Sequence, residues 1–245
     1  MDSGYYAACA GMVSRIEALD TVANNLANVN TPGFRASRNV FSSLLTAAVN
    51  APLSTINQDM NDYGVLSGTV LDNSQGSLVK TGNDLDFAIE GPGFFEVQTA
   101  GGILYTRGGN FRVSPAGRLV TATGDAVMGE NGPLAIAGQP LAVSADGTLT
   151  VNGAIAGRLK VVEFAPGTQM AAAAGTYYTA PAGSAVAATH SQVRQGMLEN
   201  SNVNPLSGMV ELIAAQRDLE AMRRVLTMFS SEMDKTAVQD LPRVG

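Results

Sequence analysis

The sequence predicts an α+β fold: N- and C-terminal helices paired in a coiled-coil-like layer, with an antiparallel all-β domain inserted between them in the chain. At both chain ends, apolar residues recur at alternating spacings of four and three, the period of a helix with one buried seam. In the middle, short runs of β-forming residues alternate with turns rich in glycine, proline and asparagine. The 245 residues suffice for one large domain or two modest ones.

The first segment has the pattern of a helix that stops at a proline. Pro32 disfavours helical geometry at the residue before it, and Gly33 suits a tight turn. The helix is therefore expected to end near Asn28–Asn30. An apolar stretch at residues 39–49 follows and is compatible with a helix or a strand. The seam of the first helix consists of Tyr5, Cys9, Met12, Ile16, Leu19, Ala23 and Leu26.

Residues 84–164 change to the pattern of an antiparallel β domain built of hairpins. Asp146-Gly147 and Asn152-Gly153 are candidates for tight turns. Residues 165–190, rich in alanine and glycine, are expected to be extended connecting chain. The predicted strands are the runs LDFAI, FFEV, ILYT, FRV, RLVT, LAV, TLTV and LKVVEF.

The last segment repeats the helical pattern of the first, and Asn204-Pro205 with Ser207 offers a helix start. Its seam consists of Leu212, Ala215, Leu219, Met222, Leu226, Phe229 and Met233. Neither helix buries its stripe alone, so the two are expected to pack together. The expected domains are the paired helices in 1–38 plus 200–245, a linking segment in 39–83, and the β-rich domain with its return strand in 84–199.

Composition narrows the classes of partner. Hydrophobic residues make up 45% of the chain and charged residues only 15%, so extensive contact with other proteins is expected. The formal net charge is −6, and lysine and arginine form no cluster. Neutralising phosphates requires concentrated positive charge, so nucleic acid and anionic membrane surfaces are disfavoured as partners.

The single cysteine, the N-terminal residues and the lack of long apolar runs limit where the protein is expected to act. Cys9 has no second thiol for a disulfide or a zinc site. The first twenty residues lack the basic and apolar regions of a cleaved signal peptide. No apolar run approaches the ~20 residues that span a bilayer. We therefore expect a protein without direct membrane insertion that is cytosolic or leaves the cell without signal cleavage.

Candidates for catalysis are few, and no enzyme activity, cofactor or metal is predicted. His190 stands alone in a stretch of small residues, and nothing resembling GxSxG supports a hydrolase. Asp84 and Asp86 are two residues apart and could point to the same face of a strand. Glycosidases use two such carboxylates, but the edge of any polar strand can carry them as well. Cys9 lies on the apolar seam and is expected to be a buried, inert thiol.

Residues 24–34, NNLANVNTPGF, concentrate uncharged amides at the predicted helix end. Asn24, Asn25 and Asn28 fall at or beside the seam. An amide both donates and accepts hydrogen bonds, so these residues could set the register between subunits without burying charge. Local capping of the helix, with a turn at Asn30, is the alternative, and the sequence leaves both uses open.

Three separated motifs, in the same order, resemble those of bacterial flagellar rod and hook proteins. The first is ALDTVANNLANVNTPGFRASRNVF. The second is NDLDFAIEGPGFFEVQ followed by LYTRGGNFRVSPAGRLVTATGDAVMG, and the third is QGMLENSNVNPLSGMVELIAAQRDLEAMRRVL. Within the family, the modest length and the short span before the second motif resemble the proximal-rod branch. The distal-rod branch is the alternative, and a secreted surface binding module is the alternative outside the family.

The resemblance implies a structural subunit whose paired helices line a central channel while the β domain faces outward. It implies helical assembly with copies of itself and neighbouring axial proteins in the periplasmic rod of the basal body, and export through the flagellar type III apparatus. The implied assembly residues are Asn24, Asn25, Leu26, Asn28, Thr31, Gly33, Phe34, Asn200, Ser201, Asn202, Val203 and Asn204. The seam residues Leu212, Leu219, Met222, Leu226 and Phe229 complete the expected interface.

Overall fold

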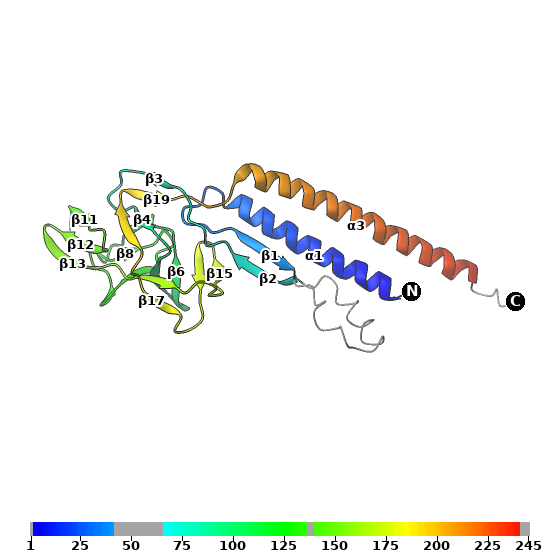
Figure 1. The fold of residues 1–245 in the computed structure, drawn as a ribbon, viewed down its shortest axis with the longest axis horizontal. Helices are drawn as coiled ribbons and strands as arrows, with labels where there is room; N and C mark the ends of the chain where they lie inside the picture. Colours follow the sequence, from blue (N-terminus) through cyan, green and yellow to red (C-terminus); the bar gives the residue numbers. More distant parts are fainter. Residues whose placement is uncertain (1, 42–65, 137–139, 241–245) are drawn as a thin grey trace. The chain divides into compact units, whose positions relative to one another are not determined.

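The fold is α+β, with two long helices at the chain ends and a large antiparallel β region between them (Figure 1). A computed structural model describes residues 2–41, 66–136 and 140–240. The chain divides into two compact units. The helical unit contains α1 (Asp2–Ala27) and α3 (Pro205–Asp240).

The second compact unit, the β unit, consists of residues 27–37 and 70–204. It thus includes the turn after α1 and the stretch 70–83, which sequence patterns assigned to the helical layer and to the linking segment. Both stretches bond to the β strands, as described below. The first residues of the apolar stretch 39–49 belong to strand β1 (Ser37–Phe41), which pairs with β2 (Leu66–Leu71). The rest of that stretch lies outside the described residues.

The two helices begin and end close to the positions that their flanking residues predict. α1 ends at Ala27, directly before the expected window; residues 28–30 form a turn, and Pro32 disfavours helical geometry at Thr31. α3 begins at Pro205, whose fixed φ suits the first helical position and whose missing N–H costs no bond there. Among the residues described, neither helix is long and apolar enough to cross a membrane.

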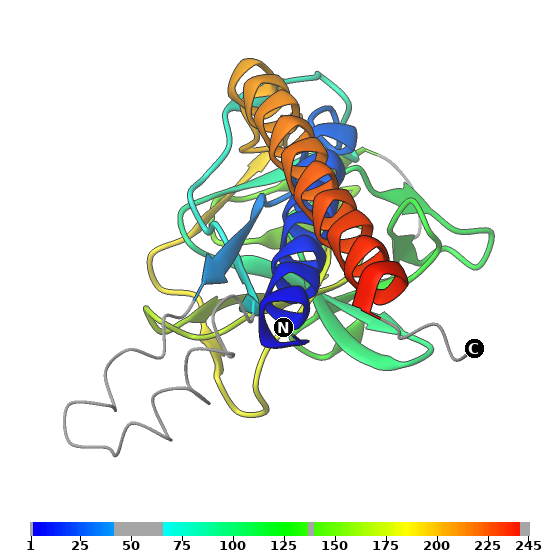
Figure 2. The same ribbon diagram turned by 90° about the vertical axis from the view of Figure 1, so that its right-hand side faces the viewer.

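α1 and α3 lie side by side and run antiparallel (Figures 1 and 2). Arg15 Nη1 lies 2.9 Å from Asp218 Oδ2 in an exposed ion pair. A Cβ added at Gly11 would stand 3.3 Å from the terminal methyl of Met222. On α3, the predicted seam is the half-buried line of the helix, and it continues backward to buried Gly208. The described seam residues are Leu212, Ala215, Leu219, Met222 and Leu226.

On α1 the predicted seam is present in part: Cys9, Met12, Leu19 and Leu26 are half-buried. Ser14 is buried and Gly11 is half-buried; they lie three residues apart on one face. Ile16 and Ala23, which the spacing placed on the seam, are exposed. Small residues let a neighbouring helix approach closely, whereas a heptad count rewards only large apolar side chains. The prediction for these two positions was therefore wrong.

The β unit is built from antiparallel pairs. Its ten-stranded sheet follows the order β15-β16-β6-β5-β9-β8-β7, with β10 beside β9, β14 beside β5, and β17 beside β14. A three-stranded sheet has the order β11-β12-β13. The last strands of the unit return to its first strands, since β18 pairs with β4 and β19 with β3.

The strands of the β unit are short. Their bounds are β3 (Leu78–Lys80), β4 (Phe87–Glu90), β5 (Phe94–Thr99), β6 (Gly102–Thr106), β7 (Arg112–Val113), β8 (Leu119–Val120), β9 (Ala126–Gly129), β10 (Gly132–Pro133), β11 (Leu141–Val143), β12 (Thr148–Val151), β13 (Ala154–Arg158), β14 (Val161–Phe164), β15 (Ala171–Ala174), β16 (Tyr177–Thr179), β17 (Ala185–Ala187), β18 (Gln192–Gln195) and β19 (Met197–Glu199).

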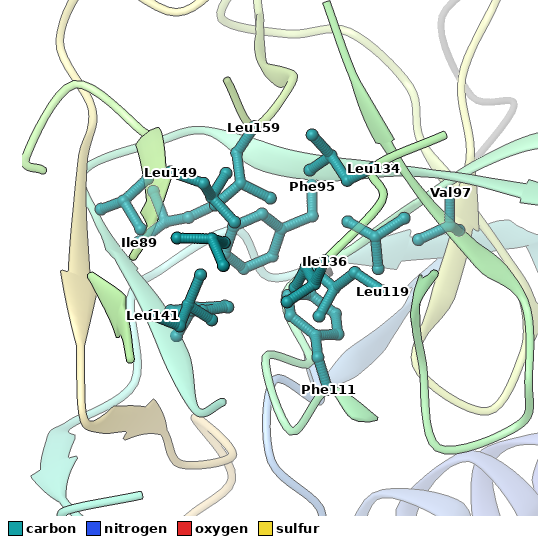
Figure 3. Packing of buried hydrophobic residues seen from close by; sticks show 14 of the residues in the cluster. Ile89, Phe95, Val97, Phe111, Leu119, Leu134, Ile136, Leu141, Leu149 and Leu159 are labelled. Atoms are coloured by element: carbon teal, nitrogen blue, oxygen red, sulfur yellow. The ribbon is translucent and has the colours of Figure 1, made fainter. Parts of the chain in front are cut away.

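One apolar core joins these sheets (Figure 3). Phe95 and Val97 from β5, Ile89 from β4 and Leu149 from β12 are fully buried in it. The ring of Phe111 meets that of Phe95 edge to face, with centroids 5.2 Å apart, a favoured aromatic geometry. Because strands from separate sheets share this core, the β unit is a single packed body.

Each of the eight predicted runs contains a strand, but residues 165–190 differ from the prediction. Instead of extended connecting chain, they form the β15–β16 hairpin and β17. Burial of Tyr177 and Tyr178 on the sheet holds the hairpin in place. The predicted Asn152-Gly153 turn is present, and both residues have positive φ, as the tightest hairpin turns require.

Candidate functional site

The turn after α1 is closed by its own residues. The backbone N–H of Thr31 donates to the Asn28 carbonyl at 3.1 Å, and the Thr31 hydroxyl donates to Asn28 Oδ1 at 3.1 Å. The N–H of Phe34 then donates to the Thr31 carbonyl at 3.2 Å. In this way residues 28–37, the Thr-Pro-Gly segment, turn away from the direction of the helix. Asn28 therefore takes part in local capping.

Gly33 brings this segment against other parts of the β unit, at Arg107, Gly108 and Glu199. Its φ is +73°, a conformation that side chains with a Cβ disfavour. A Cβ here would also collide with the backbone of Arg107 and Gly108. The N–H of Gly33 donates to the Glu199 carbonyl at 2.8 Å. Only glycine meets both requirements, so Gly33 fixes where the chain returning from the β strands passes.

Residues 199–204, the Asn-Ser-Asn segment, lie beside the Thr-Pro-Gly segment. The Oδ1 of Asn202 accepts from the N–H of Ala36 at 2.7 Å. Its Nδ2 donates to the carbonyls of Asp72 at 2.8 Å and Ser74 at 3.0 Å. One amide thus ties together three stretches that are far apart in sequence, which uses both its donor and its acceptor.

Beneath these segments lies a buried Arg–Glu–Arg cluster of Arg35, Glu199 and Arg107. Arg35 Nη2 is 2.8 Å from Glu199 Oε1, and Arg107 Nη1 is 3.0 Å from Glu199 Oε2. All three side chains are only 1% exposed. The N–H of Gly76 also donates to Glu199 Oε1 at 2.8 Å, and Arg35 donates to the Ser74 carbonyl. A buried carboxylate so fully bonded is costly to disturb.

Backbone carbonyls also accept hydrogen bonds from the guanidinium of Arg107. Its Nη1 donates to the carbonyl of Ile89 at 3.2 Å and its Nη2 donates to that of Gly91 at 2.5 Å. Burial lowers the pKa of Arg107 to about 10, against the opposing pull of Glu199, while Arg35 adds to the lowering. The guanidinium is therefore still charged near neutral pH, and the cluster holds two cations against one carboxylate.

Tyr178 links this cluster to the turn at Gly33. Its hydroxyl accepts from the backbone N–H of Arg35 at 2.8 Å and reaches the Gly33 carbonyl at 3.4 Å. Burial raises the pKa of Tyr178 to about 12, so the hydroxyl stays protonated and can donate. The ring of Phe94 packs beside Tyr178 and beneath the guanidinium of Arg107, 4.9 Å from its centroid, which favours a desolvated cation.

The predicted assembly residues fall into groups by burial. Gly33 and Phe34 are buried inside their own chain. Asn24, Asn200 and Asn204 are exposed. Phe229 lies in α3, and its side chain is outside the described residues. The half-buried members are Asn25, Leu26, Asn28, Thr31, Ser201, Asn202, Val203, Leu212, Leu219, Met222 and Leu226.

Residues 28–37 and 199–204 together with the Arg–Glu–Arg cluster form the junction. Sequence reasoning missed its charged members. Arg35 directly follows the Thr-Pro-Gly-Phe stretch, and Glu199 directly precedes Asn-Ser-Asn. Their positions beside the two asparagine-rich segments were visible, but Arg107 lies 92 residues before Glu199. A single sequence carries no signal that joins charges at such separations.

Among the described residues, the ring of His190 forms hydrogen bonds only with Thr189 and Glu163. Its side chain is 81% exposed, with Nδ1 3.3 Å from Glu163 Oε2. Ser191 donates its hydroxyl proton to Glu163 at 2.7 Å and accepts from the N–H of Gly93 at 2.8 Å. The serine is thus hydrogen-bonded to the carboxylate and not to the imidazole, so Ser191, His190 and Glu163 do not follow the serine–imidazole–carboxylate order of a triad.

The two aspartates of the NDLDF run have different surroundings. Asp86 is buried and accepts from the Thr81 hydroxyl at 2.7 Å and from Asn83 Nδ2 at 3.1 Å. Asp84 is exposed. The buried carboxylate closes a turn before β4, which is a structural use. Within the described ranges, no group of three or more His, Cys, Asp or Glu could hold a metal ion.

Comparison with known proteins finds three matches along the chain. Residues 6–35 match the family described as Flagella basal body rod protein. Residues 88–151 match the Flagellar hook protein FlgE/F/G D1 domain, and residues 194–240 match the Flagellar basal body rod FlgEFG protein C-terminal family. A flagellar basal-body rod protein FlgF of Caulobacter vibrioides is 33% identical, with 100% of both chains covered. This chain belongs to the flagellar basal-body rod protein family.

Other rod proteins of this family are similarly related. FlgF of Salmonella typhimurium is 33% identical, covering 93% of this chain and 94% of its own. FlgG of Bacillus subtilis is 30% identical, covering 91% and 93%. The three matched regions each contribute one member of the Arg–Glu–Arg cluster: Arg35, Arg107 and Glu199. The cluster is therefore the place where the three parts of this rod protein meet.

Proposed function

We propose that this rod-family chain is a FlgF-type subunit of the proximal rod, which assembles helically with copies of itself and neighbouring axial proteins. The resulting shaft transmits torque and encloses the export channel. Membership of a family of structural rod proteins makes the chain a structural subunit and not an enzyme. The observation that carries the proposal is the full-length similarity to FlgF, with all three matched regions in place.

The helices are proposed to form a coiled-coil-like inner layer completed by neighbouring subunits. The half-buried seam of α3 and the Arg15–Asp218 pair support packing against α1. α3 also carries large apolar side chains that its own chain leaves exposed, and such surface favours contact with further subunits. These side chains are Leu206, Met209, Val210, Ile213, Val225 and Met228.

The junction is proposed to transmit load between helix and β strands. Residues 28–37 continue directly from α1, and residues 199–204 lead directly into α3. Within the β unit the first segment is fastened to Glu199, the first residue of the second segment, through the Gly33 N–H and the Arg35 side chain. A force applied through either segment therefore reaches the same buried residue. The exposed Asn24, Asn200 and Asn204 are proposed to contact neighbouring subunits.

The proposed location is the periplasmic rod of the flagellar basal body. Rod subunits of this kind would reach it through the flagellar type III apparatus without signal cleavage, and the export apparatus is the proposed partner before assembly. The absence of basic clusters in the sequence agrees with partners that are proteins and not nucleic acids.

Complementation tests this function in the bacterium that makes the protein. A strain lacking the gene should regain swimming with the full chain, but not with a chain lacking residues 2–27. His190→Ala and Asp84→Asn should swim like the parent, because neither side chain holds the fold or performs chemistry. Loss of swimming with both point variants, at normal protein levels, would support a hydrolase and oppose the structural reading.

The distal-rod member is the second candidate, because FlgG of Bacillus subtilis is 30% identical over nearly the whole chain. Strains lacking either gene separate the two. Rescue of the strain that lacks the FlgF-type gene supports the proximal assignment. Rescue of the FlgG-type strain alone supports the distal one.

A further inference from the structure

Six strands of the large sheet form one continuous antiparallel path. The order is β15-β16-β6-β5-β14-β17, because β5 pairs with β6 along one side and with β14 at Phe94 and Phe95 on the other. β9 pairs with β5 farther along, at Val97 and Gln98, and leaves this path intact. Among the described strands, β15 pairs only with β16 and β17 only with β14.

The two ends of this path are short strands that carry neither a charge nor a proline. Proteins guard edges with charge, proline or very short strands. The other edges of this sheet follow that rule: β7 has two residues, including Arg112, and β10 has two, including Pro133. In contrast, β15 is four exposed alanines, and β17 is Ala-Val-Ala with Val186 61% exposed. Neither carries a charge.

The number of strands decides how copies could join. Directions alternate along six antiparallel strands, so β15 and β17 run in opposite directions. A second copy in the same orientation, placed beyond β15, would present its β17 antiparallel to that strand. An odd number of strands would give a parallel contact instead. The repeat is head-to-tail, so the contact leaves an edge free for the next copy.

We propose that β15 of one subunit pairs with β17 of the next, so that the β units of successive copies share a continuous antiparallel sheet. The occupant is a second copy of this chain, since the same molecule supplies both uncharged edges in matching direction. Three or four residues per edge offer few hydrogen bonds, so the pairing forms only where helical contacts already hold neighbours together. The inference thus rests on the proposed rod assembly.

Disulfide cross-linking tests this pairing. Paired strands place Cα atoms about 4.5–5.5 Å apart, within disulfide range. Two full-length variants, Ala173→Cys and Val186→Cys, are made with Cys9→Ser to remove the native thiol. Ala172→Cys and Ala187→Cys cover the neighbouring register. Basal bodies are isolated from cells that express one variant or both, and oxidised.

Disulfide-linked dimers only where a β15 variant and a β17 variant are expressed together would support the proposal. Dimers in cells with a single variant would overturn it in favour of a two-fold contact. Absence of dimers from every combination, in rods that assemble normally, would also overturn it while leaving the rod function intact. Failure of the parent chain to enter rods would instead count against the proposed function.

A charge placed on the edge gives an independent readout. Val186→Lys should lower swimming of the complemented strain several-fold, since one unpaired charge would enter each subunit contact. Ile155→Lys is the matched control, because Ile155 is 76% exposed on β13, outside the six-strand path. Equal swimming of the two variants, at equal protein levels, would contradict edge pairing.

Discussion

At the scale of single residues, Glu199 contributes most to the junction, because it is the only carboxylate within the bonded trio with Arg35 and Arg107. Glu199→Gln removes the negative charge and keeps the shape. Two buried guanidinium groups would then lack an anion, which typically costs ~3–5 kcal/mol. We expect chemical denaturation of the variant to show the free energy of unfolding of the β unit lowered by that amount.

Glu90→Gln is the matched control for this substitution. Glu90 forms a 2.8 Å pair with Arg194, but its side chain is 53% exposed. An exposed pair contributes ~0–1 kcal/mol. Equal losses for the two variants would mean that burial of the cluster does not add to its strength.

Gly33→Ala separates backbone strain from collision. Gly33 and Gly82 have nearly the same φ, +73° and +76°, so alanine costs ~1 kcal/mol at either through conformation alone. Nothing lies within 4 Å of a Cβ at Gly82, whereas one at Gly33 meets the Arg107–Gly108 backbone. We expect thermal unfolding to show a further ~1–3 kcal/mol lost at Gly33. Matching losses would refute the close approach.

Glu163 gives the β unit an acid-sensitive contact. Burial alone would raise the pKa of Glu163, but hydrogen bonds from Ser191 and from His190 outweigh it and hold the pKa below the ordinary 4.5. The folded state therefore binds this proton more weakly than the unfolded state does. The contribution is complete above pH ~5 and is lost as pH falls below 4.5 through the folded value.

Glu163→Gln should therefore flatten the acid side of the stability curve. Urea midpoints measured from pH 7 to pH 3 would show the parent losing more stability than the variant. Parallel curves for the two proteins would show that the carboxylate is not linked to folding.

At the scale of elements, the sequence predicted those helices and strands in which large apolar residues repeat at a regular spacing, and missed features built from small residues. The α3 seam was found because leucine and methionine repeat on one face. The α1 line through Gly11 and Ser14 was missed, since small residues that permit close packing carry no hydrophobic signal. For the same reason β15 was missed: four alanines have no β pattern, and only the tyrosines of β16 hold them to the sheet. The junction itself depends on pairings across long separations, which no local pattern encodes.

The last strands of the β unit are also its closing elements. β18 and β19 pair with β4 and β3, and Val193 reaches the core. A chain ending at residue 190 lacks these strands and Glu199, while a chain ending at residue 204 keeps them. We expect the longer fragment to unfold cooperatively in urea and the shorter one to have no cooperative transition. Cooperative unfolding of the shorter fragment would show that the earlier strands form a stable body alone.

At the scale of the whole molecule, stability should be divided unevenly between the two units. The β unit has a fully buried core, whereas the described seam residues of α3 are half-buried at best, apart from Gly208. Long helices with little buried surface open readily. In dilute full-length protein, we expect amide hydrogen exchange to be slow in β4 and β5 and fast in α1 and α3. Assembly into rods should slow exchange in the helices, because neighbours then cover their apolar faces and ordering accompanies docking. The β unit should change little. Strong protection of both helices in the dilute monomer would mean that the pair is already complete, and that the apolar side chains outside its seam do not depend on neighbouring subunits.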